Sequence, residues 1–398
     1  MERRHHMDKR VYFLMIVSFV VGMVELIIGG ILDLIAIDLN VTLGQAGLLI
    51  TIFSLIFAIF GPILLLATAK IERKQLTFIS LFIFLIGNII TIFSTTYAVV
   101  FIGRVVSAAS GSLLVILCLI LAPSIVEPRY RGRAIGLVSM GISGSIALGL
   151  PIGLILGNTF GWRSPFILIS LLTILSMVGV MFFMEKVEPK PPIPIGKQLA
   201  TLKNRKILFA QLTTFLFLAG HSTLYTYFKP FLVTTMGLNG TWISVIYLIF
   251  GVAAVSGGGF GGTLADHFGA RKATFTTIII FACSIFMIPY TTTILGVFLI
   301  TLVFWGMMSW AITPAVQSYL IETSPDTSDI QQSLNNSALH FGIAFGSLIG
   351  GIAIENFPVE HNATIGGMIV LLSFVTALIS MYDRSPGIKQ QKTKQHTY

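Results

Sequence analysis

Charged side chains are scarce in this sequence. Asp, Glu, Lys and Arg make up 10% of the 398 residues, whereas a soluble domain carries about 25%. Hydrophobic residues make up 55%, so the polar residues are too few to cover a water-soluble globule. Apolar surface needs no such cover inside a lipid bilayer. The composition therefore excludes a soluble enzyme and indicates a protein embedded in a membrane.

Cysteines and the sequence signatures of common enzyme sites are also nearly absent. Cys118 and Cys283 are the only cysteines, and both lie in apolar runs, which excludes a disulfide framework and a cysteine metal site. The sequence contains no GxxxxGK[ST] loop for ATP phosphates and no HExxH zinc motif. We therefore expect no enzymatic activity, no metal and no bound cofactor.

Long apolar runs, by contrast, fill the chain. A spanning helix needs about 20 apolar residues, and twelve runs meet this requirement. They cover residues 11–37, 45–67, 76–93, 98–122, 134–157, 164–184, 207–228, 241–264, 273–290, 295–319, 330–354 and 363–382. The first run is too long for the core of a signal peptide, so it predicts a first spanning helix. Met7 is an alternative start, and residues 1–6 are left out of the fold prediction.

Basic residues are distributed unevenly between the two ends of these helices. An even number of spans places both chain termini on one side, and all but three of the 25 Lys and Arg residues fall on that side. The exceptions are Arg163 and Lys229 on the opposite side and Arg104 within a span. Because basic loops mark the cytoplasmic face, we expect both termini in the cytoplasm and the protein in a bacterial plasma membrane. The net charge of +9 then reflects orientation, and we expect no nucleic-acid partner.

The chain divides near its middle. The longest polar connection, 185–206, follows the sixth span, and segments 66–74 and 264–272 match at an offset of 198 residues. Parallel repeats of this kind enclose a substrate path in transporters. We therefore predict an all-α membrane protein with twelve transmembrane helices in two pseudosymmetric six-helix halves. The predicted parts are an N-terminal segment 1–10, a first half 11–184, a linker 185–206, a second half 207–382 and a tail 383–398.

The segment after the eighth span carries the most specific local pattern. It runs Gly262-Thr-Leu-Ala-Asp266-His-Phe-Gly269-Ala-Arg271-Lys272 and resembles the loop motif of the major facilitator superfamily. A carboxylate there can cap a helix N-terminus or pair with a cation, so we expect Asp266 to latch one conformation. The predicted latch comprises Gly262, Asp266, Gly269, Arg271 and Lys272. An ordinary basic turn is the alternative, and the first-half copy, with Thr68 in place of the acid, has a weaker latch or none.

Two acidic residues lie in the first span. Glu25 is near its centre, where an ionised side chain costs roughly 2.5–3.5 kcal/mol, so such a residue faces a cavity or a partner. Removal from water favours a neutral carboxyl group, which suits reversible protonation. We predict that Glu25 carries a coupling proton, with a hydrogen-bonded structural role as the alternative. Asp33 lies eight residues further on and is either a second acidic step or an interfacial residue.

Arg104 is the only Lys or Arg residue inside a predicted span. It lies about 9 Å from the outer end of the fourth helix, at a depth close to that of Glu25 and Asp33. Because an intramembrane Arg needs a partner, we predict an ion pair with one of these acids. Segment 104–111 also resembles the fourth-helix motif of the superfamily, in which the Arg serves proton coupling. A static ion pair between helices is the alternative.

The fifth span contains Gly149, Pro151 and Gly153. Glycine permits close helix packing and proline bends a helix. The pattern resembles a degenerate form of the antiporter motif of the superfamily, which favours export. Close packing alone is the alternative explanation.

Polar aromatic residues in the second half form the predicted substrate site. His221 and Tyr225 are four residues apart in the seventh span, so they share a helix face. Their side chains can hydrogen-bond a heterocycle or a sugar. His340 in the eleventh span and Trp305 and Trp310 in the tenth complete the prediction, because Trp stacks on planar rings. Bonds to neighbouring helices for His, and lipid contact for Trp, are the alternatives.

Along nearly its whole length the chain resembles the twelve-helix drug–proton antiporter branch of the superfamily. Segments 24–31, 66–74, 160–163, 220–227 and 324–333 carry the resemblance. The nearest likeness is to bacterial purine efflux pumps, followed by arabinose and sugar efflux permeases. Asp33 and His340 depart from these relatives, which usually have Pro at the first position and Gln or Asn at the second.

The resemblance implies a monomeric exporter that exchanges a small molecule for protons by alternating access. Purine bases or their analogues are the first candidate substrates, and the proton is the coupling ion. A broad-specificity drug or sugar exporter is the alternative. An importer of the same fold and a non-transporting sensor are further alternatives, although segment 185–206 is too short to fold as a signalling domain.

Overall fold

The computed structural model describes residues 9–127, 131–189 and 194–382, all of which lie in helices, turns or short connections. Twelve helices in this part of the chain are long and apolar enough to cross a membrane, as predicted. The elements are α1 Lys9–Asp38, α2 Leu43–Ala67, α3 Arg73–Ile92, α4 Tyr97–Ser124, α5 Arg131–Gly144, η2 Ser145–Gly149, α6 Leu150–Phe160, α7 Ser164–Phe183, α8 Ile195–Ala200, η3 Thr201–Lys203, α9 Arg205–Tyr225, α10 Phe228–Met236, α11 Thr241–Phe268, α12 Ala270–Thr291, α13 Leu295–Thr323, η4 Pro325–Thr327, α14 Ser328–Asn356 and α15 His361–Tyr382. The predicted N-terminal segment up to residue 8, linker residues 190–193 and the tail 383–398 lie outside the described residues.

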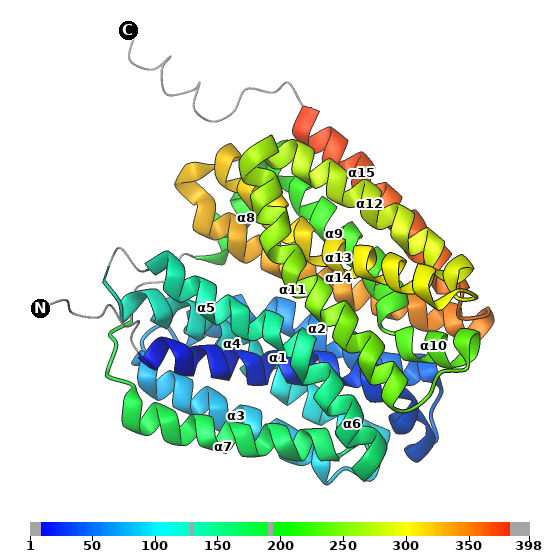
Figure 1. Ribbon diagram of the computed structural model, residues 1–398. Helices are drawn as coiled ribbons and strands as arrows, with labels where there is room; N and C mark the ends of the chain where they lie inside the picture. The colour runs from blue at the N-terminus through cyan, green and yellow to red at the C-terminus, as the bar shows by residue number, and fades with distance from the viewer. Residues whose placement is uncertain (1–8, 128–130, 190–193, 383–398) are drawn as a thin grey trace, which may run out of the picture.

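The helices form two bundles that follow one another in the chain. α1 to α7 lie together in one bundle and α9 to α15 in the other (Figure 1). α8 and η3 connect the bundles in the chain and contact α14 and α9 of the second bundle. α1 begins and α15 ends on the same side of the molecule (Figure 1), which we name the terminal side. The opposite side, where α1 ends at Asp38 and α14 at Asn356, is named the far side.

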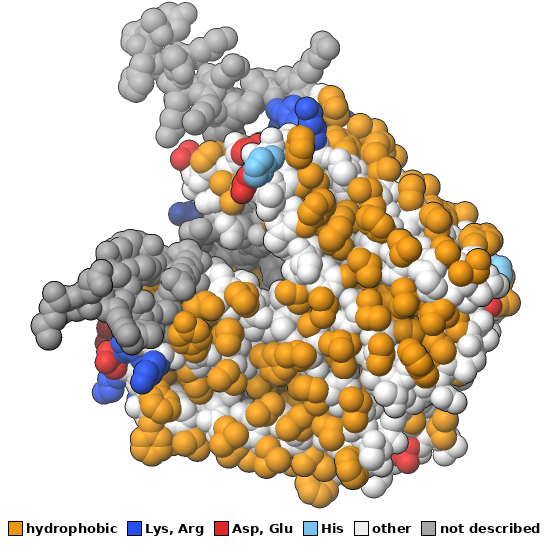
Figure 2. All heavy atoms as spheres, in the orientation of Figure 1, with side chains coloured by type: hydrophobic (Ala, Val, Ile, Leu, Met, Phe, Trp, Pro, Cys, Tyr) orange, Lys and Arg blue, Asp and Glu red, His pale blue; other side chains and the backbone are white. Residues whose placement is uncertain are grey.

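Apolar side chains cover the outer surface as well as the core. Ile, Leu, Phe and Val are exposed on both bundles, and Figure 2 shows them spread across one broad face, with the few charged side chains towards its margins. A lipid environment accommodates such a surface without cost, because lipid tails are as apolar as these side chains. The surface therefore agrees with the spans expected from the sequence.

Glycines allow the helices within each bundle to approach closely. On α14, a Cβ added at Gly342, Gly346 or Gly350 would lie 2.1 to 2.4 Å from backbone carbonyl oxygens of α9. These three positions are four residues apart, so they form one face of the helix. Small residues at this spacing bring backbones together where lipid provides no hydrophobic driving force.

The fifth predicted span contains an irregularity that the sequence pattern does not reveal. A π-helical segment, Ser145–Gly149, separates α5 from α6, and the N–H of Leu150 donates to the carbonyl of Ser145. Pro151 follows directly and has no N–H to donate. π-bulges of this kind are frequent at functional sites.

The seventh predicted span also breaks, because α9 ends at Tyr225 and α10 begins at Phe228. Pro230, in the first turn of α10, cannot donate to the carbonyl four residues before it. α10 therefore starts in a new direction on the far side. This break brings Tyr227 and Lys229 against the first bundle.

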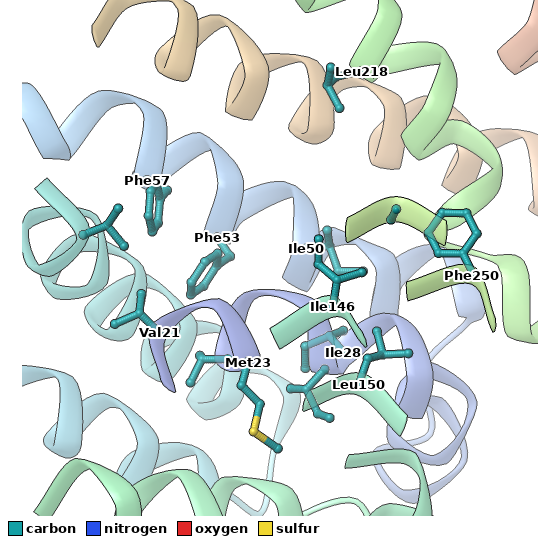
Figure 3. Close-up of a cluster of buried hydrophobic side chains, with 14 of the residues drawn as sticks. Val21, Met23, Ile28, Ile50, Phe53, Phe57, Ile146, Leu150, Leu218 and Phe250 are labelled. Atoms are coloured by element: carbon teal, nitrogen blue, oxygen red, sulfur yellow. The ribbon is translucent and has the colours of Figure 1, made fainter. Parts of the chain in front are cut away.

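The bundles contact each other at the far side through Thr42 and Gly44 with Glu355, Gly47 with Tyr227, and Asp33 with Lys229. Further contacts lie deeper in the molecule, between Glu25 and His340 and between Ala58 and Ser337. Figure 3 shows apolar side chains buried in this region, with Phe53 and Phe57 from α2, Ile146 from η2, Leu150 from α6, and Leu218 and Phe250 from the second bundle. The surface is indented between the bundles on the terminal side (Figure 2). The structure is therefore closed at the far side.

Candidate functional site

A cluster of aromatic side chains lies inside the second bundle. His221 and Tyr225 stack with their ring centroids 4.9 Å apart, because four residues of α9 return a side chain to the same face. Trp305 of α13 is 5.5 Å from the ring of His221 and 5.0 Å from that of Phe250 on α11. We name as the aromatic cluster His221, Tyr225, Phe228, Tyr247, Phe250, Phe281 and Trp305.

Four polar atoms of this cluster have no hydrogen-bond partner among the described residues. They are Nδ1 of His221, the hydroxyls of Tyr225 and Tyr247, and Nε1 of Trp305, and all four are buried. An unsatisfied buried polar group costs about 1–3 kcal/mol, so most such groups in proteins have a partner. These atoms can form hydrogen bonds with water or with a bound small molecule. Aromatic faces with a few convergent polar atoms are typical of small-molecule sites.

The other two predicted substrate residues lie apart from this cluster. Trp310 is half-buried on α13, and none of the ring contacts of the aromatic cluster involves it. Five residues of helix rotate a side chain by about 140° relative to Trp305, so the two indoles face different neighbours. His340 lies on α14, where its ring contacts Phe57 with a centroid distance of 4.3 Å.

Glu25 and His340 face each other across the two bundles. Nδ1 of His340 lies 3.1 Å from Oε1 of Glu25, and both side chains are largely buried. The acid comes from the centre of α1 and the imidazole from the centre of α14. An imidazole beside a carboxylate can share or exchange a proton with it, so this pair is the candidate proton site.

The predicted ion pair between Arg104 and an acid of α1 is absent from this structure. Arg104 is fully buried, and it donates to the carbonyl oxygens of Val24 at 2.8 Å and Leu49 at 3.4 Å. Its guanidinium also lies 4.0 Å from the ring centre of Phe53, a favourable cation–π arrangement. In the structure the partners of Arg104 are thus helix carbonyls and an aromatic ring, whereas its depth in the membrane had led us to predict a carboxylate.

Asp33 is paired at the far side. Its Oδ1 lies 2.7 Å from Nζ of Lys229, and Lys229 also donates to Asn158 of α6 at 3.4 Å. Lys229 is nearly buried, whereas about a third of the Asp33 side chain is exposed. Asp33 and Lys229 come from different bundles, so this ion pair joins the two bundles at the closed side.

The predicted latch of Asp266 does not form in this structure. Gly269, with φ of 83°, ends α11 and starts α12, as expected for the turn glycine of the motif. Asp266 is exposed, and the N-terminus of α12 has no side-chain cap. Among the described residues, Asp266 has no hydrogen bond or ion pair. The loop sits on the terminal side, away from the contacts that close the structure, so no partner approaches it.

The first-half copy of this loop contains an acid that the sequence analysis did not single out. Glu72 precedes α3, and its carboxylate accepts hydrogen bonds from the backbone N–H groups of Lys74, Gln75 and Val187. Burial acts to raise the pKa of Glu72, but these hydrogen bonds outweigh it and lower that pKa below its usual value. Glu72 thereby caps α3 and ties the start of the linker to it. An acid directly before the start of a predicted span was the available signal, because a carboxylate is stabilising at a helix N-terminus.

The predicted antiporter motif packs α6 against α1. A Cβ added at Gly153 would lie 1.5 Å from Cδ1 of Ile27, and one at Gly149 would lie 3.1 Å from Cγ of Met23. Pro151 lies between them, two residues after the π-helical segment ends at Gly149. Across the bundle interface, a Cβ at Gly251 of α11 would lie 2.5 Å from the backbone of Ala147. The glycines therefore serve close packing at the point where α11 crosses the π-helix.

Comparison with known proteins gives the family. The sequence profile described as Major Facilitator Superfamily matches residues 14–334 and 212–397. The chain belongs to the major facilitator superfamily. An "Uncharacterized MFS-type transporter YbcL" of Bacillus subtilis is 34% identical over 371 residues, which cover 93% of this chain and 95% of that protein. A "Probable sugar efflux transporter" of Mannheimia succiniciproducens is 27% identical and covers 92% of each chain.

Solved structures share the fold. A D-xylose-proton symporter superposes with a TM-score of 0.74 at 15% identity, covering 93% of this chain and 96% of that one. The human organic anion transporter MFSD10 (TETRAN) gives a TM-score of 0.68 at 14% identity, covering 94% of this chain and all of that one. At these identities the likeness concerns the fold alone. As a superfamily member, the chain is a multi-pass membrane transporter of small molecules and not an enzyme.

Proposed function

We propose that this superfamily member exports a planar heterocyclic molecule, such as a purine base, in exchange for protons. The observation that carries the proposal is the aromatic cluster, where four unpaired polar atoms adjoin several ring faces. A purine offers ring faces for stacking and nitrogen donors and acceptors around its edge. It could therefore satisfy His221, Tyr225 and Trp305 at once.

Glu25 is the proposed proton carrier. It is the acid at the centre of α1, in the contact region between the bundles. Protonation of Glu25 changes the charge at this contact, so it can bias the equilibrium between two arrangements of the bundles. The membrane potential supplies about 2.3 kcal/mol for each charge moved through 100 mV.

The terminal side is proposed to face the cytoplasm. The basic loops on that side support this orientation. The far side would then face outward, and the present structure, closed at the far side, would be the state that collects substrate from the cytoplasm. We propose a monomer as the working unit, because each chain supplies both bundles and the contact between them.

Uptake of radiolabelled adenine and hypoxanthine into inside-out vesicles with an acidic lumen tests the proposal. Export by the protein appears in this assay as accumulation, which an uncoupler should abolish. Accumulation should also be lost in Glu25→Gln. Persistence of uphill accumulation with an unchanged pH dependence in that variant would refute the role of Glu25.

A sugar is the second candidate substrate. A relative named as a probable sugar efflux transporter covers nearly the whole chain, and stacked aromatic rings with polar edges also suit a pyranose or pentose ring. Arabinose and xylose in the same vesicles distinguish the two classes. Accumulation of a pentose without purine accumulation would replace the heterocycle with a sugar.

A further inference from the structure

The far-side end of the aromatic cluster lies beside a buried cation. Arg73, Arg104 and Lys229 are the buried Lys and Arg residues in the described part of the chain. Arg73 starts α3 on the terminal side, and Arg104 is held by helix carbonyls and a phenylalanine ring. Lys229 directly follows Phe228, whose ring lies 5.0 Å from that of Trp305. Lys229 is therefore the buried cation next to the proposed substrate site.

Tyr247 of α11 connects the aromatic cluster to this cation. Its side chain is 1% exposed, and its ring meets those of Tyr225 and Phe228 edge-on, at centroid distances of 6.1 and 5.5 Å. Its hydroxyl is one of the four unpaired polar atoms of the cluster. That hydroxyl lies near the backbone N–H of Lys229 and within electrostatic range of the Asp33 carboxylate. A buried hydroxyl without a partner is thus aimed at the start of α10, where no side chain caps the helix.

The break between α9 and α10 adds a second source of positive charge. α9 ends at Tyr225 and α10 begins at Phe228, so the seventh span consists of two half-helices. The N-terminus of a helix carries a partial positive charge, and half-helix N-termini of this kind face anionic substrate groups in transporters. The start of α10 and the ammonium of Lys229 therefore favour a negative charge on the same side of the aromatic cluster.

Asp33 supplies a negative charge to Lys229 in this structure, and it is an exchangeable partner. Oδ1 of Asp33 lies 2.7 Å from Nζ of Lys229, but the Asp33 side chain is 32% exposed and that of Lys229 only 4%. Asp33 also lines a far-side pocket of about 540 Å³, together with Ala36, Ile37, Asn40, Val41 and Leu43. A carboxylate released from the ion pair can be solvated there, whereas a buried ammonium needs another partner.

We propose that the substrate of the aromatic cluster carries a negative charge at one edge, and that this charge replaces Asp33 as the partner of Lys229. This inference rests on the proposed function and narrows its substrate class to planar heterocyclic anions, such as purines that bear a carboxylate. The ring stacks in the aromatic cluster, while the carboxylate accepts hydrogen bonds from the hydroxyl of Tyr247 and the ammonium of Lys229. Charge-assisted hydrogen bonds are about twice as strong as neutral ones, so they select the anion over a neutral molecule of the same shape.

Purine-6-carboxylate and purine-6-carboxamide test the proposal, because they differ in charge but hardly in shape. Equilibrium binding of each radiolabelled purine is measured on the purified protein in lipid nanodiscs, where no proton gradient is present. The parent should bind the carboxylate about tenfold more tightly, which is the difference between a charge-assisted and a neutral hydrogen bond. The ratio of the two affinities is the readout, because a change in the folded fraction or in far-side closure affects both ligands alike.

Substitutions around the cation should change this ratio in opposite directions. Lys229→Gln should abolish the preference for the carboxylate, and Tyr247→Phe should reduce it in part. Asp33→Asn should raise the ratio above that of the parent, because it removes the competing carboxylate, and it tests the exchange even if Lys229→Gln does not fold. The exposed Lys203→Gln is the matched control and should keep the parental ratio.

Equal affinities for the two purines in the parent, or a preference for the carboxylate that survives Lys229→Gln, would overturn the proposal. An Asp33→Asn ratio no higher than the parental one would do the same. Equal affinities that fall together in Trp305→Phe would leave the aromatic cluster as the binding site and remove only the anion preference. Binding of neither purine would count against the aromatic cluster itself, and so against the proposed function as well.

Discussion

At the residue scale, the two tryptophans of α13 allow a role in ligand binding to be distinguished from a role in helix packing. Trp305 is fully buried with its Nε1 unpaired, whereas Trp310 is half-buried and outside the aromatic cluster. Trp305→Phe keeps a ring and removes the N–H donor. We expect the KM for adenine to rise roughly three- to tenfold with little change in maximal rate, because one hydrogen bond contributes about 0.5–1.5 kcal/mol.

Trp310→Phe is the matched control and should leave the KM unchanged. Initial rates of vesicle uptake over a range of adenine concentrations give both constants. Equal effects of the two substitutions would show that the aromatic cluster does not select the substrate.

The ionisable residues show how much of the candidate site can be predicted from the sequence. Glu25, Asp33 and Arg104 stand out in the sequence because charges within spans are costly, and all three have specific partners in the structure. Their partners were predicted wrongly, since hydropathy gives the depth of a side chain but not the direction in which it leaves the helix. Lys229 and His340 come from the other bundle, so only the packing of the bundles shows their partnership.

At the scale of single elements, adjacent glycines of α11 have opposite environments. A Cβ added at Gly257 would lie 1.9 Å from the carbonyl oxygen of Met307, while one at Gly258 meets no atom within 4 Å. Gly257→Ala should therefore force α11 and α13 apart and destabilise the protein by roughly 1–3 kcal/mol. Thermal unfolding of the purified protein should show a lower Tm for Gly257→Ala.

Gly258→Ala serves as the control and should leave the Tm unchanged or raise it slightly, because Ala favours a helix over Gly by about 1 kcal/mol. A Tm that falls equally in both variants would show that the contact between α11 and α13 does not cause the loss of stability.

Glu72 contributes to stability in a way that depends on pH. The pKa of Glu72 is lower in the folded protein than its ordinary value of 4.5. Its contribution to the free energy of unfolding is therefore present above pH 4.5 and is lost as the pH falls through the lower pKa of the folded state. Glu72→Ala should lower stability at pH 7 by about 1 kcal/mol, as expected for a lost helix cap. The difference in Tm from the parent should shrink as the pH approaches 4.

The exposed Glu322→Ala is the control for loss of one carboxylate and should show no such pH dependence. A Glu72→Ala deficit that remained constant down to pH 4 would contradict a role for the ionised carboxylate.

Element positions were largely predictable, but their irregularities were not. A run of about 20 apolar residues defines a span whatever its internal geometry, so the twelve spans were found. The π-helix at Ser145–Gly149 and the break before α10 depend on Pro151 and Pro230 together with packing from the other bundle. A proline in a span predicts a departure from regular helix geometry. It does not predict whether that departure is a π-helix or a break between two helices.

At the scale of the whole molecule, the repeat predicts two related halves but not which state they adopt. Alternating access requires at least two packings of the same halves, and the sequence encodes both. In this structure the far side is closed by Asp33 with Lys229 and by Thr42 with Glu355. The exposed Asp266 fits the same state, because a latch on the terminal side has no partner while the bundles meet at the far side.

The ion pair of Asp33 and Lys229 leads to an asymmetric prediction about this closure. Lys229 is nearly buried and Asp33 is about one-third exposed, so removal of the acid leaves a buried cation unpaired, whereas removal of the base leaves an acid that water can reach. Asp33→Ala should therefore open the far side more than Lys229→Ala, with a fall of about tenfold or more in the closed-to-open ratio. Thr95 and Asn239 are exposed in far-side connections of the two bundles, so spin labels on Thr95→Cys and Asn239→Cys in a Cys118→Ala, Cys283→Ser background measure that ratio. The exchanged pair Asp33→Lys with Lys229→Asp should recover part of it. If both single variants open the far side equally and the exchange recovers nothing, the pair only fills space, and closure depends on the apolar contact of α10 with the first bundle.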